Sequence, residues 1–296
     1  MSALLPPWPA TDVFLQGRTL SVRHAPSAKA GAATAVYVHG LGGASTNWTD
    51  LMGLLQGEVE GWAPDLNGFG QSPPPRDGDY SPLGHAKAVA QFIDEELGGR
   101  EVHLFGNSLG GAASLQLAAR RPELVKSLTL ISPALPEVRP NRTNIVLPLL
   151  GIPGLGESLS ARSAKVDVAT RVQTTFKTCF ADPSCVPPER FEEAVEAATA
   201  YGALPYSSDA FLQSLRGLLK TYLDPGPRRP WKLAELVQAK TLLIYGRQDL
   251  LVNPHGAVKS TKHFKHAQVM VLSDSGHVSQ LEHPQIVADA WIKRFG

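Results

Sequence analysis

Cysteine is scarce in this chain, with 2 residues in 296. Cys179 and Cys185 are too few to build the disulfide framework of a small secreted protein. They lie close enough in sequence for a local bridge, but we expect two free thiols. Neither a histidine nor a second cysteine pair stands at ligand spacing from them, so the sequence predicts no metal site and calls for no cofactor.

The chain also lacks an excess of charge and long apolar runs. Its 28 Lys and Arg nearly balance 27 Asp and Glu, for a net charge of +1, which gives no reason to expect a nucleic-acid partner. The longest apolar stretch, residues 145–156, is interrupted by Pro and Gly and is too short to cross a bilayer. The first residues lack the basic and apolar regions of a signal peptide. We therefore expect a soluble, cytoplasmic protein without stable membrane insertion; the sequence indicates no oligomeric state.

Short apolar runs alternate with helical patterns over most of the chain, of which 43% is hydrophobic. Residues 12–25 alternate around a central glycine and predict a hairpin. Buried strands are predicted at residues 34–40, 59–66, 101–106, 125–132, 240–246 and 267–273. Helices are predicted at residues 81–99, at 108–122 and after each of the last two strands. This alternation predicts an α/β fold with a mostly parallel sheet and helices on both faces.

Residues 134–230 break the alternation. They contain no strand pattern, and helical patterns stand at 188–202 and 209–223. Ordinary crossover helices are the simpler interpretation, but one crossover needs far fewer residues. We therefore expect a helical insertion over the carboxyl end of the sheet, with residues 1–133 and 231–296 forming the core.

A serine stands between glycines where a predicted strand meets a predicted helix. The pentapeptide Gly106-Asn107-Ser108-Leu109-Gly110 predicts a nucleophile elbow, although glycine-rich turns also occur without catalysis. Ser108 must project its Oγ above the sheet from a strained backbone, and neighbours without side chains let the strand and helix approach closely. The positive end of the helix would then face a developing oxyanion.

A serine hydroxyl needs a base to take its proton, and His277 is the candidate. It follows the last predicted strand, where a loop can reach back over the sheet. His283 precedes Pro284 at a predicted helix start, so we expect a surface or capping role for it. His103 lies within a strand, and we expect it in the core.

The base in turn needs an orienting carboxylate, and Asp249 is the candidate because it follows the preceding strand. Its simpler interpretation is a turn former. Asp224 and Asp274 are weaker rivals. The order Ser108, Asp249, His277 is the chain order expected for elbow chemistry.

An oxyanion needs hydrogen-bond donors, which the backbone can supply. The amide of Leu109, directly after the nucleophile, is the first candidate. The second should come from the glycine-rich loop after residues 34–40, where Leu41 or Gly42 could present its N–H. We expect His39 to be structural.

These motifs together resemble the α/β-hydrolase superfamily. The segments that carry the resemblance are HGLGG (39–43), DLNGFGQS (65–72), GNSLGG (106–111), GRQD (246–249) and SGH (275–277). The resemblance implies an eight-stranded sheet with a helical cap inserted after the sixth strand. It implies architectural roles for Asp65, Gly68 and Gly70.

The resemblance also implies an activity, for which three hypotheses stand. In the first, Ser108 attacks a carboxylic ester of a small to medium apolar substrate, His277 relays the proton, Asp249 holds the imidazolium, and water cleaves the acyl-enzyme. The second is a carbon–carbon hydrolase of the meta-cleavage-product type, with Arg162 or Arg171 near the substrate carboxylate. The third is a non-catalytic small-molecule receptor, which a complete triad disfavours.

The predicted insertion contributes one substrate hypothesis. Its apolar segment at 144–159 is bent by prolines and could line an acyl pocket through Leu149, Leu150 and Ile152. Ordinary packing of the insertion against the core would explain the same pattern.

Overall fold

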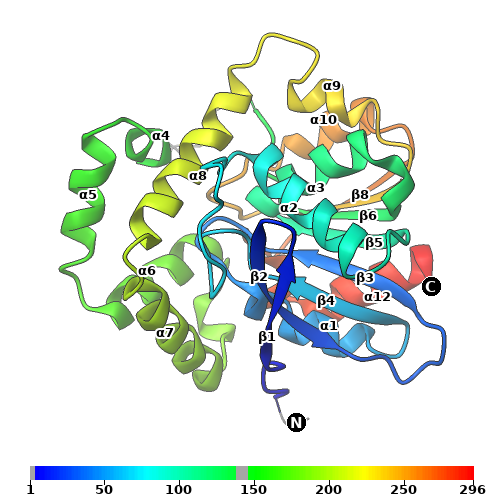
Figure 1. The fold of residues 1–296 in the computed structure, drawn as a ribbon, viewed down its shortest axis with the longest axis horizontal. Coiled ribbons are helices and arrows are strands. Elements are labelled where there is room, and N and C mark those ends of the chain that lie inside the picture. Colours follow the sequence, from blue (N-terminus) through cyan, green and yellow to red (C-terminus); the bar gives the residue numbers. More distant parts are fainter. Residues whose placement is uncertain (1–3, 138–145) are drawn as a thin grey trace.

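The computed structural model describes residues 4–137 and 146–296. Its centre is an eight-stranded sheet with the strand order β1-β2-β4-β3-β5-β6-β7-β8 (Figure 1). The strands are β1 (Ala10–Leu15), β2 (Arg18–Ala25), β3 (Ala33–Val38), β4 (Val59–Pro64), β5 (Val102–Asn107), β6 (Val125–Ile131), β7 (Lys240–Gly246) and β8 (Ala267–Leu272). The pairs β1–β2 and β2–β4 are antiparallel, and every other neighbouring pair is parallel. The mostly parallel sheet and the α/β fold predicted from the sequence are confirmed.

Helices cover both faces of this sheet (Figure 1). The helices of the described residues are α1 (Thr49–Leu55), α2 (Pro82–Glu95), α3 (Leu109–Arg120), α4 (Val146–Leu150), α5 (Leu155–Ser163), α6 (Val168–Cys179), α7 (Pro188–Gly202), α8 (Ser207–Tyr222), α9 (Pro230–Ala234), α10 (Gly256–His263), α11 (Ser279–Glu282) and α12 (Pro284–Phe295). Helix α2 begins where expected, because the Ser81 hydroxyl accepts a hydrogen bond from the Gly84 amide at 3.1 Å and Pro82 opens the first turn.

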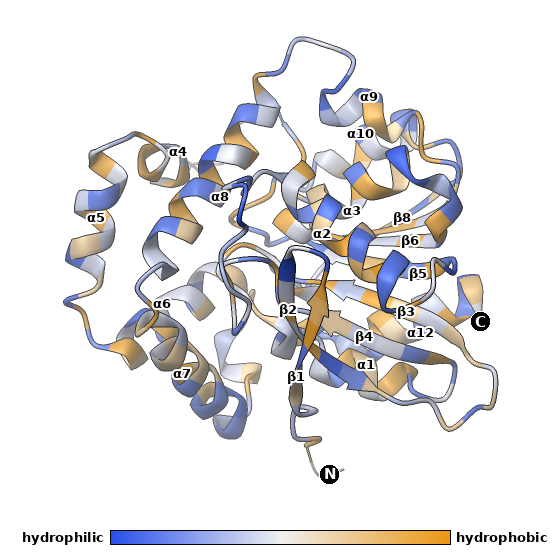
Figure 2. Cartoon of the chain, viewed as in Figure 1, coloured by the Kyte–Doolittle hydropathy of each residue, from blue (hydrophilic) through white to orange (hydrophobic). Residues whose placement is uncertain are grey.

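Alternate residues of each central strand face opposite cores. In β3, Val36 and Val38 join the core formed with α2 and α3, whereas Ala35 and Tyr37 join the core formed with α1 and α12. Burial on both faces explains why the central strands read as continuous apolar runs. The helices that cover them carry both hydrophobic and hydrophilic residues (Figure 2).

Helices α4 to α8 all lie between β6 and β7 in the chain and form a layer beside the sheet (Figure 1); we call these helices the insertion. The structure confirms the predicted helices at α7 and α8. It adds α4, α5 and α6, which were not predicted from the sequence. Helix α8 lies against α2, where His85 Nε2 and Ser214 Oγ are 3.1 Å apart. Among the described residues, every helix is too short or too polar to span a membrane.

Candidate functional site

Ser108 sits at the junction of β5 and α3 in a backbone conformation that few residues adopt. Its φ is 54° and its ψ is −116°. A non-glycine residue at such a φ is held there at a cost of about 1–3 kcal/mol. Three backbone hydrogen bonds hold it: the Ser108 amide donates to the Ile131 carbonyl at 3.1 Å, and its carbonyl accepts from the amides of Ala112 at 3.0 Å and Ala134 at 2.9 Å.

The glycines around Ser108 allow the close approach that this conformation requires. A Cβ on Gly106 would lie 2.6 Å from the Gly110 carbonyl oxygen, and a Cβ on Gly110 would overlap the carbonyl oxygen of Val38 in β3. Any side chain at either position would therefore push the strand and the helix apart. The Gly-x-Ser-x-Gly pattern has a steric origin in this fold.

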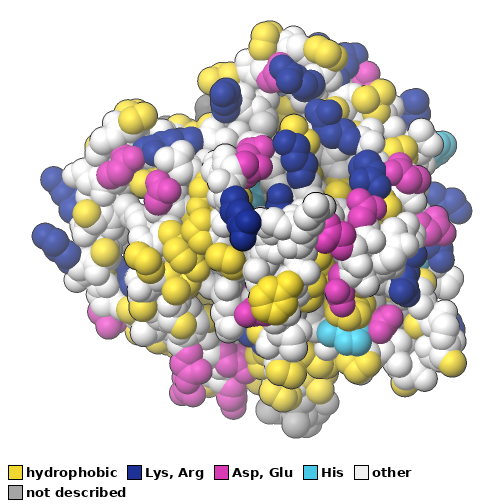
Figure 3. Space-filling model, in the orientation of Figure 1, with side chains coloured by type: hydrophobic (Ala, Val, Ile, Leu, Met, Phe, Trp, Pro, Cys, Tyr) yellow, Lys and Arg dark blue, Asp and Glu magenta, His cyan; other side chains and the backbone are white. Residues whose placement is uncertain are grey.

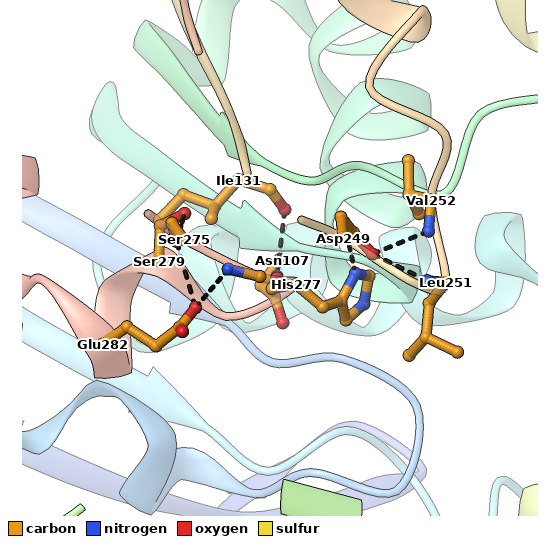
Figure 4. Close-up of polar contacts among 10 residues, drawn as sticks. Asn107, Ile131, Asp249, Leu251, Val252, Ser275, His277, Ser279 and Glu282 are labelled. Carbon is orange, nitrogen blue, oxygen red and sulfur yellow. Dashed lines mark hydrogen bonds and ion pairs between the residues drawn. The ribbon is translucent and has the colours of Figure 1, made fainter. Parts of the chain in front are cut away.

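His277, in the loop after β8, and Asp249, in the loop after β7, form a buried pair (Figure 4). His277 Nδ1 lies 2.9 Å from Asp249 Oδ2, and the two residues are only 4% and 3% exposed. The other carboxylate oxygen of Asp249 accepts hydrogen bonds from the amides of Leu251 at 2.8 Å and Val252 at 2.9 Å. A carboxylate next to Nδ1 keeps the proton on that nitrogen, so Nε2 carries the free lone pair. The pair has the arrangement required of an oriented general base.

The main chain of His277 is bound on both sides. Its amide donates to the carbonyl of Cys179, the last residue of α6, at 2.6 Å. The His277 carbonyl accepts a hydrogen bond from Asn107 Nδ2 at 3.1 Å. The side-chain amide of Asn107 also donates to the Ile131 carbonyl at 3.0 Å. We call residues 273–278, between β8 and α11, the histidine loop. Because Asn107 directly precedes Ser108, the bond from Asn107 to His277 ties this loop to the residue beside the candidate nucleophile. The sequence analysis missed this role, although Asn107 is inside the pentapeptide.

The loop after β3 lies against Ser108. A Cβ on Gly40 would be 3.2 Å from Ser108 Cβ, and the loop turns through a 3.1 Å hydrogen bond from the Gly43 amide to the Gly40 carbonyl. Gly42 has a φ of 72°. On the other side, Leu109 is the first residue of α3, so its amide has no partner within the helix. This placement agrees with oxyanion donors at Leu109 and at Leu41 or Gly42, which remain predictions.

Apolar side chains surround the junction. Leu109 and Ala112 of α3 are buried in one cluster with Ala134 and with Leu218 of α8. Leu41 and Tyr222 pack against this cluster. The insertion thus contributes Leu218 and Tyr222 of α8 to this cluster.

The predicted pocket residues lie on and just after α4, which packs against α8. Leu149 is 41% exposed and Ile152 is 46% exposed, and Leu150 is half-buried. Hydrophobic side chains do gather on the face where the insertion meets the core (Figure 3). A pocket lined by Leu149, Leu150 and Ile152 remains a prediction.

The rival side chains have other partners. Asp224 accepts from the Gly226 amide at 2.8 Å, and Asp274 is exposed. His283 binds the Asp274 carbonyl at 2.9 Å. His103 is buried between β5 and β6, where its Nδ1 lies 2.7 Å from Ser127 Oγ, and burial lowers its pKa to about 4. Among the described residues, no carboxylate is hydrogen-bonded to His103 or Ser127, which fits the core role expected of His103.

Asp65 and His39, for which we expect structural roles, both accept hydrogen bonds from main-chain amides. The Asp65 carboxylate accepts hydrogen bonds from the amides of Ser45 and Gln71. His39 is fully buried, and its Nε2 accepts from the Leu66 amide at 2.9 Å. These bonds fix the loops after β3 and β4 against each other.

Cys179 and Cys185 are free thiols, as expected. Burial raises the pKa of Cys179 to about 12, so its sulfur stays protonated at neutral pH. Within residues 4–137 and 146–296, no group of three or more His, Cys, Asp or Glu is placed to hold a metal ion.

A model of the alpha/beta hydrolase fold family matches residues 36–284. The chain is 29% identical to the dihydrolipoyllysine-residue acetyltransferase component of the acetoin cleaving system of Pseudomonas putida, over 83% of the chain and 59% of that protein. It is 28% identical to the 2-hydroxymuconate semialdehyde hydrolase of Pseudomonas sp. (strain CF600), over 83% and 81%. It is 25% identical to Lipase 1 of Psychrobacter immobilis, over 85% and 73%. The chain thus spans about three fifths of the length of the acetyltransferase components.

Solved structures give the same picture of the fold. A membrane phospholipase A described as a bacterial virulence factor superimposes with a TM-score of 0.78 at 25% identity, covering 96% of this chain and 84% of the other. The meta-cleavage product hydrolase CumD superimposes with a TM-score of 0.77 at 19% identity, covering 96% and 97%. The second likeness concerns the fold alone.

Proposed function

Because the chain belongs to the α/β-hydrolase family, we propose that it is a serine hydrolase that cleaves carboxylic esters of small to medium apolar substrates. The observation that carries this proposal is the buried pair of His277 and Asp249, 2.9 Å apart, in a loop hydrogen-bonded to Asn107 beside Ser108. The relatives of this chain that support the proposal include Lipase 1 and the 2-hydroxymuconate semialdehyde hydrolase named above.

In the proposed mechanism, Ser108 Oγ attacks the ester carbonyl while His277 Nε2 takes its proton. Asp249 stabilises the imidazolium that forms, and its own orientation is set by the amides of Leu251 and Val252. The alcohol leaves with the proton held by His277, and an acyl-enzyme remains on Ser108. Water, deprotonated by the same imidazole, then attacks the acyl carbonyl and restores the serine.

The negative oxygen of each tetrahedral intermediate needs donors already in place. The Leu109 amide at the start of α3 and an amide of Leu41 or Gly42 are proposed for this role. The positive end of α3 adds a favourable field at the same point. We also propose that the insertion acts as a cap, with α8 supplying Leu218 and Tyr222 to the acyl side of the site.

Carbon–carbon hydrolysis is the second candidate, because the relative named 2-hydroxymuconate semialdehyde hydrolase matches most of both chains. Such a substrate carries a carboxylate, for which Arg162 and Arg171 were candidates. Arg162 is exposed on α5, and Arg171 on α6 lies near Gly202 at the end of α7. These positions, together with the apolar cluster at the junction, favour the ester.

The test compares p-nitrophenyl butyrate and octanoate with a dienoate chromophore. We expect ester hydrolysis with kcat/KM for an ester at least about tenfold above that for the dienoate. Ser108→Ala should lower ester turnover by about a thousandfold or more, whereas Ser158→Ala, at an exposed serine of α5, should not. Full turnover by Ser108→Ala would refute the mechanism, and preferential cleavage of the dienoate would select the second candidate.

A further inference from the structure

The end of α6 reaches out of the insertion and touches the histidine loop. The Cys179 carbonyl accepts the amide hydrogen of His277 at 2.6 Å. A Cβ on the preceding residue, Gly276, would lie 2.5 Å from the same carbonyl oxygen and 2.7 Å from the Ala181 nitrogen. The backbone of the insertion and the backbone of the loop are therefore in direct contact.

Glu282 bridges the same two segments through its carboxylate, and Figure 4 shows its bonds to the histidine loop. Its Oε1 accepts a hydrogen bond from the Ala181 amide at 2.6 Å, across 101 positions of sequence. Its Oε2 accepts from the Gly276 amide at 2.6 Å and from the Ser275 hydroxyl at 3.0 Å. One side chain thus binds the residues on either side of the contact between Cys179 and His277.

We propose that Glu282 is a positioning residue that couples the insertion to the catalytic base. This inference rests on the proposed role of His277. Hydrogen bonds to a carboxylate are shorter and stronger than those between neutral groups. Glu282 accepts such bonds from Gly276, directly before His277, and from Ala181, two residues after the Cys179 carbonyl that binds the His277 amide. The position of the His277 imidazole therefore depends on the position of the end of α6.

The physical consequence is specific to the chemical step. A shift of about 1 Å in a catalytic group can cost on the order of a hundredfold in rate. Glu282 accepts hydrogen bonds from the histidine loop and from the end of α6, whereas the apolar cluster beside Ser108 is formed by α3, α8 and Ala134. Loss of its carboxylate should therefore lower kcat and leave KM nearly unchanged.

The experiment uses Glu282→Gln in the full chain. A glutamine keeps one carbonyl oxygen and can satisfy only one of the two amides, since its NH2 group would face the other donor to donor. We expect kcat for p-nitrophenyl butyrate to fall about tenfold or more, with KM within twofold of wild type. Rates are referred to active sites titrated with a fluorophosphonate, so that only folded protein is counted.

Two further readouts separate positioning from a merely structural role. The low-field proton resonance of the His277 Nδ1–H group should shift or broaden in Glu282→Gln, and the acid limb of the kcat/KM profile should move. Glu196→Gln, at an exposed glutamate of α7 in the same insertion, is the matched control and should change none of these. If Glu282→Gln does not fold, Ser275→Ala removes one donor to the same carboxylate, and a reduction of about threefold in kcat is expected.

The outcomes are distinguishable from those of the proposed function. If Ser108→Ala retains turnover, the mechanism fails and the coupling fails with it. If Ser108→Ala is inactive but Glu282→Gln matches Glu196→Gln in kcat, resonance and pH profile, only the coupling is wrong. The proposed coupling would also be overturned if KM rose by the same factor as kcat fell while the His277 resonance stayed in place. For Ser275→Ala, an unchanged kcat is the contradicting result.

Discussion

Asn107 and His277 lie 170 positions apart in sequence, and the side-chain amide of the first donates a 3.1 Å hydrogen bond to the carbonyl of the second. The same amide group also binds the carbonyl of Ile131 at the end of β6. One buried side chain thus joins the turn that carries Ser108, the neighbouring strand and the histidine loop.

Asn107→Ala should therefore affect both stability and rate. Removing the amide leaves the buried His277 carbonyl without this donor, whereas the Ile131 carbonyl still accepts from the Ser108 amide. We expect a cost of about 1–3 kcal/mol in the free energy of unfolding. We also expect kcat for p-nitrophenyl butyrate to fall by about tenfold, because the loop that carries His277 loses one anchor. Denaturant unfolding and steady-state kinetics measure the two effects. Asn67→Ala, at another buried asparagine, should lower stability alone; an unchanged kcat in Asn107→Ala would contradict the expectation.

Asp249→Asn tests the orientation of the base. An amide in place of the carboxylate would present an NH2 group to Nδ1 and reverse the histidine tautomer, so Nε2 would no longer accept the serine proton. We expect kcat to fall by about a thousand- to ten-thousandfold with little change in KM. Asp224→Asn, at the rival carboxylate, is the control. A loss of less than tenfold in Asp249→Asn would assign the orienting role elsewhere.

Gly110→Ala tests the steric origin of the pentapeptide. The added Cβ would overlap the carbonyl oxygen of Val38, and backbone atoms cannot move aside as a side chain can. We expect a loss of at least about 2 kcal/mol in the free energy of unfolding. Gly57→Ala introduces the same methyl group where nothing lies within 4 Å and should be nearly neutral. Equal stabilities of the two variants would rule out this account of the turn.

Two buried histidines predict how stability depends on pH. Burial lowers the pKa of His85 to about 3 and that of His103 to about 4, whereas an unfolded chain titrates its histidines near pH 6.5. Below pH 6.5, His85 and His103 therefore bind protons in the unfolded state but remain neutral in the folded state until the pH approaches their lowered pKa values. The free energy of unfolding should therefore decrease as the pH falls from about 6.5 toward 4, by up to about 1.4 kcal/mol per pH unit for each histidine.

His103→Gln provides the check on this slope. It removes one of the two groups, so the decrease in the free energy of unfolding between pH 6.5 and 4.5 should be shallower than in wild type. His266→Gln, at an exposed histidine, should leave the slope unchanged. Parallel curves for wild type and His103→Gln would show that His103 does not contribute.

Local sequence patterns were sufficient to predict the strands of the sheet and several of the helices. Apolar runs and their punctuation predicted the buried strands and α2, α3, α7 and α8, because the burial of a strand or of one helix face leaves a periodic trace in the residues themselves. They did not predict α5 and α6. Helix α5 has only one buried residue, Gly156, and a helix without an extended apolar face leaves a weak periodic signal. In α6, Val168, Val172 and Phe176 do recur at helical spacing, so the signal for this helix was present in the sequence.

The sequence by itself determined the chemistry available: a serine between glycines after a strand, a histidine and an aspartate after later strands, and the family whose order they follow. Only the tertiary structure decided which groups hold them. Asn107 binds His277 across 170 positions, and Glu282 binds Ala181 across 101. Such contacts arise from the packing of whole segments and not from any short-range pattern, so no periodicity along the chain could have predicted them.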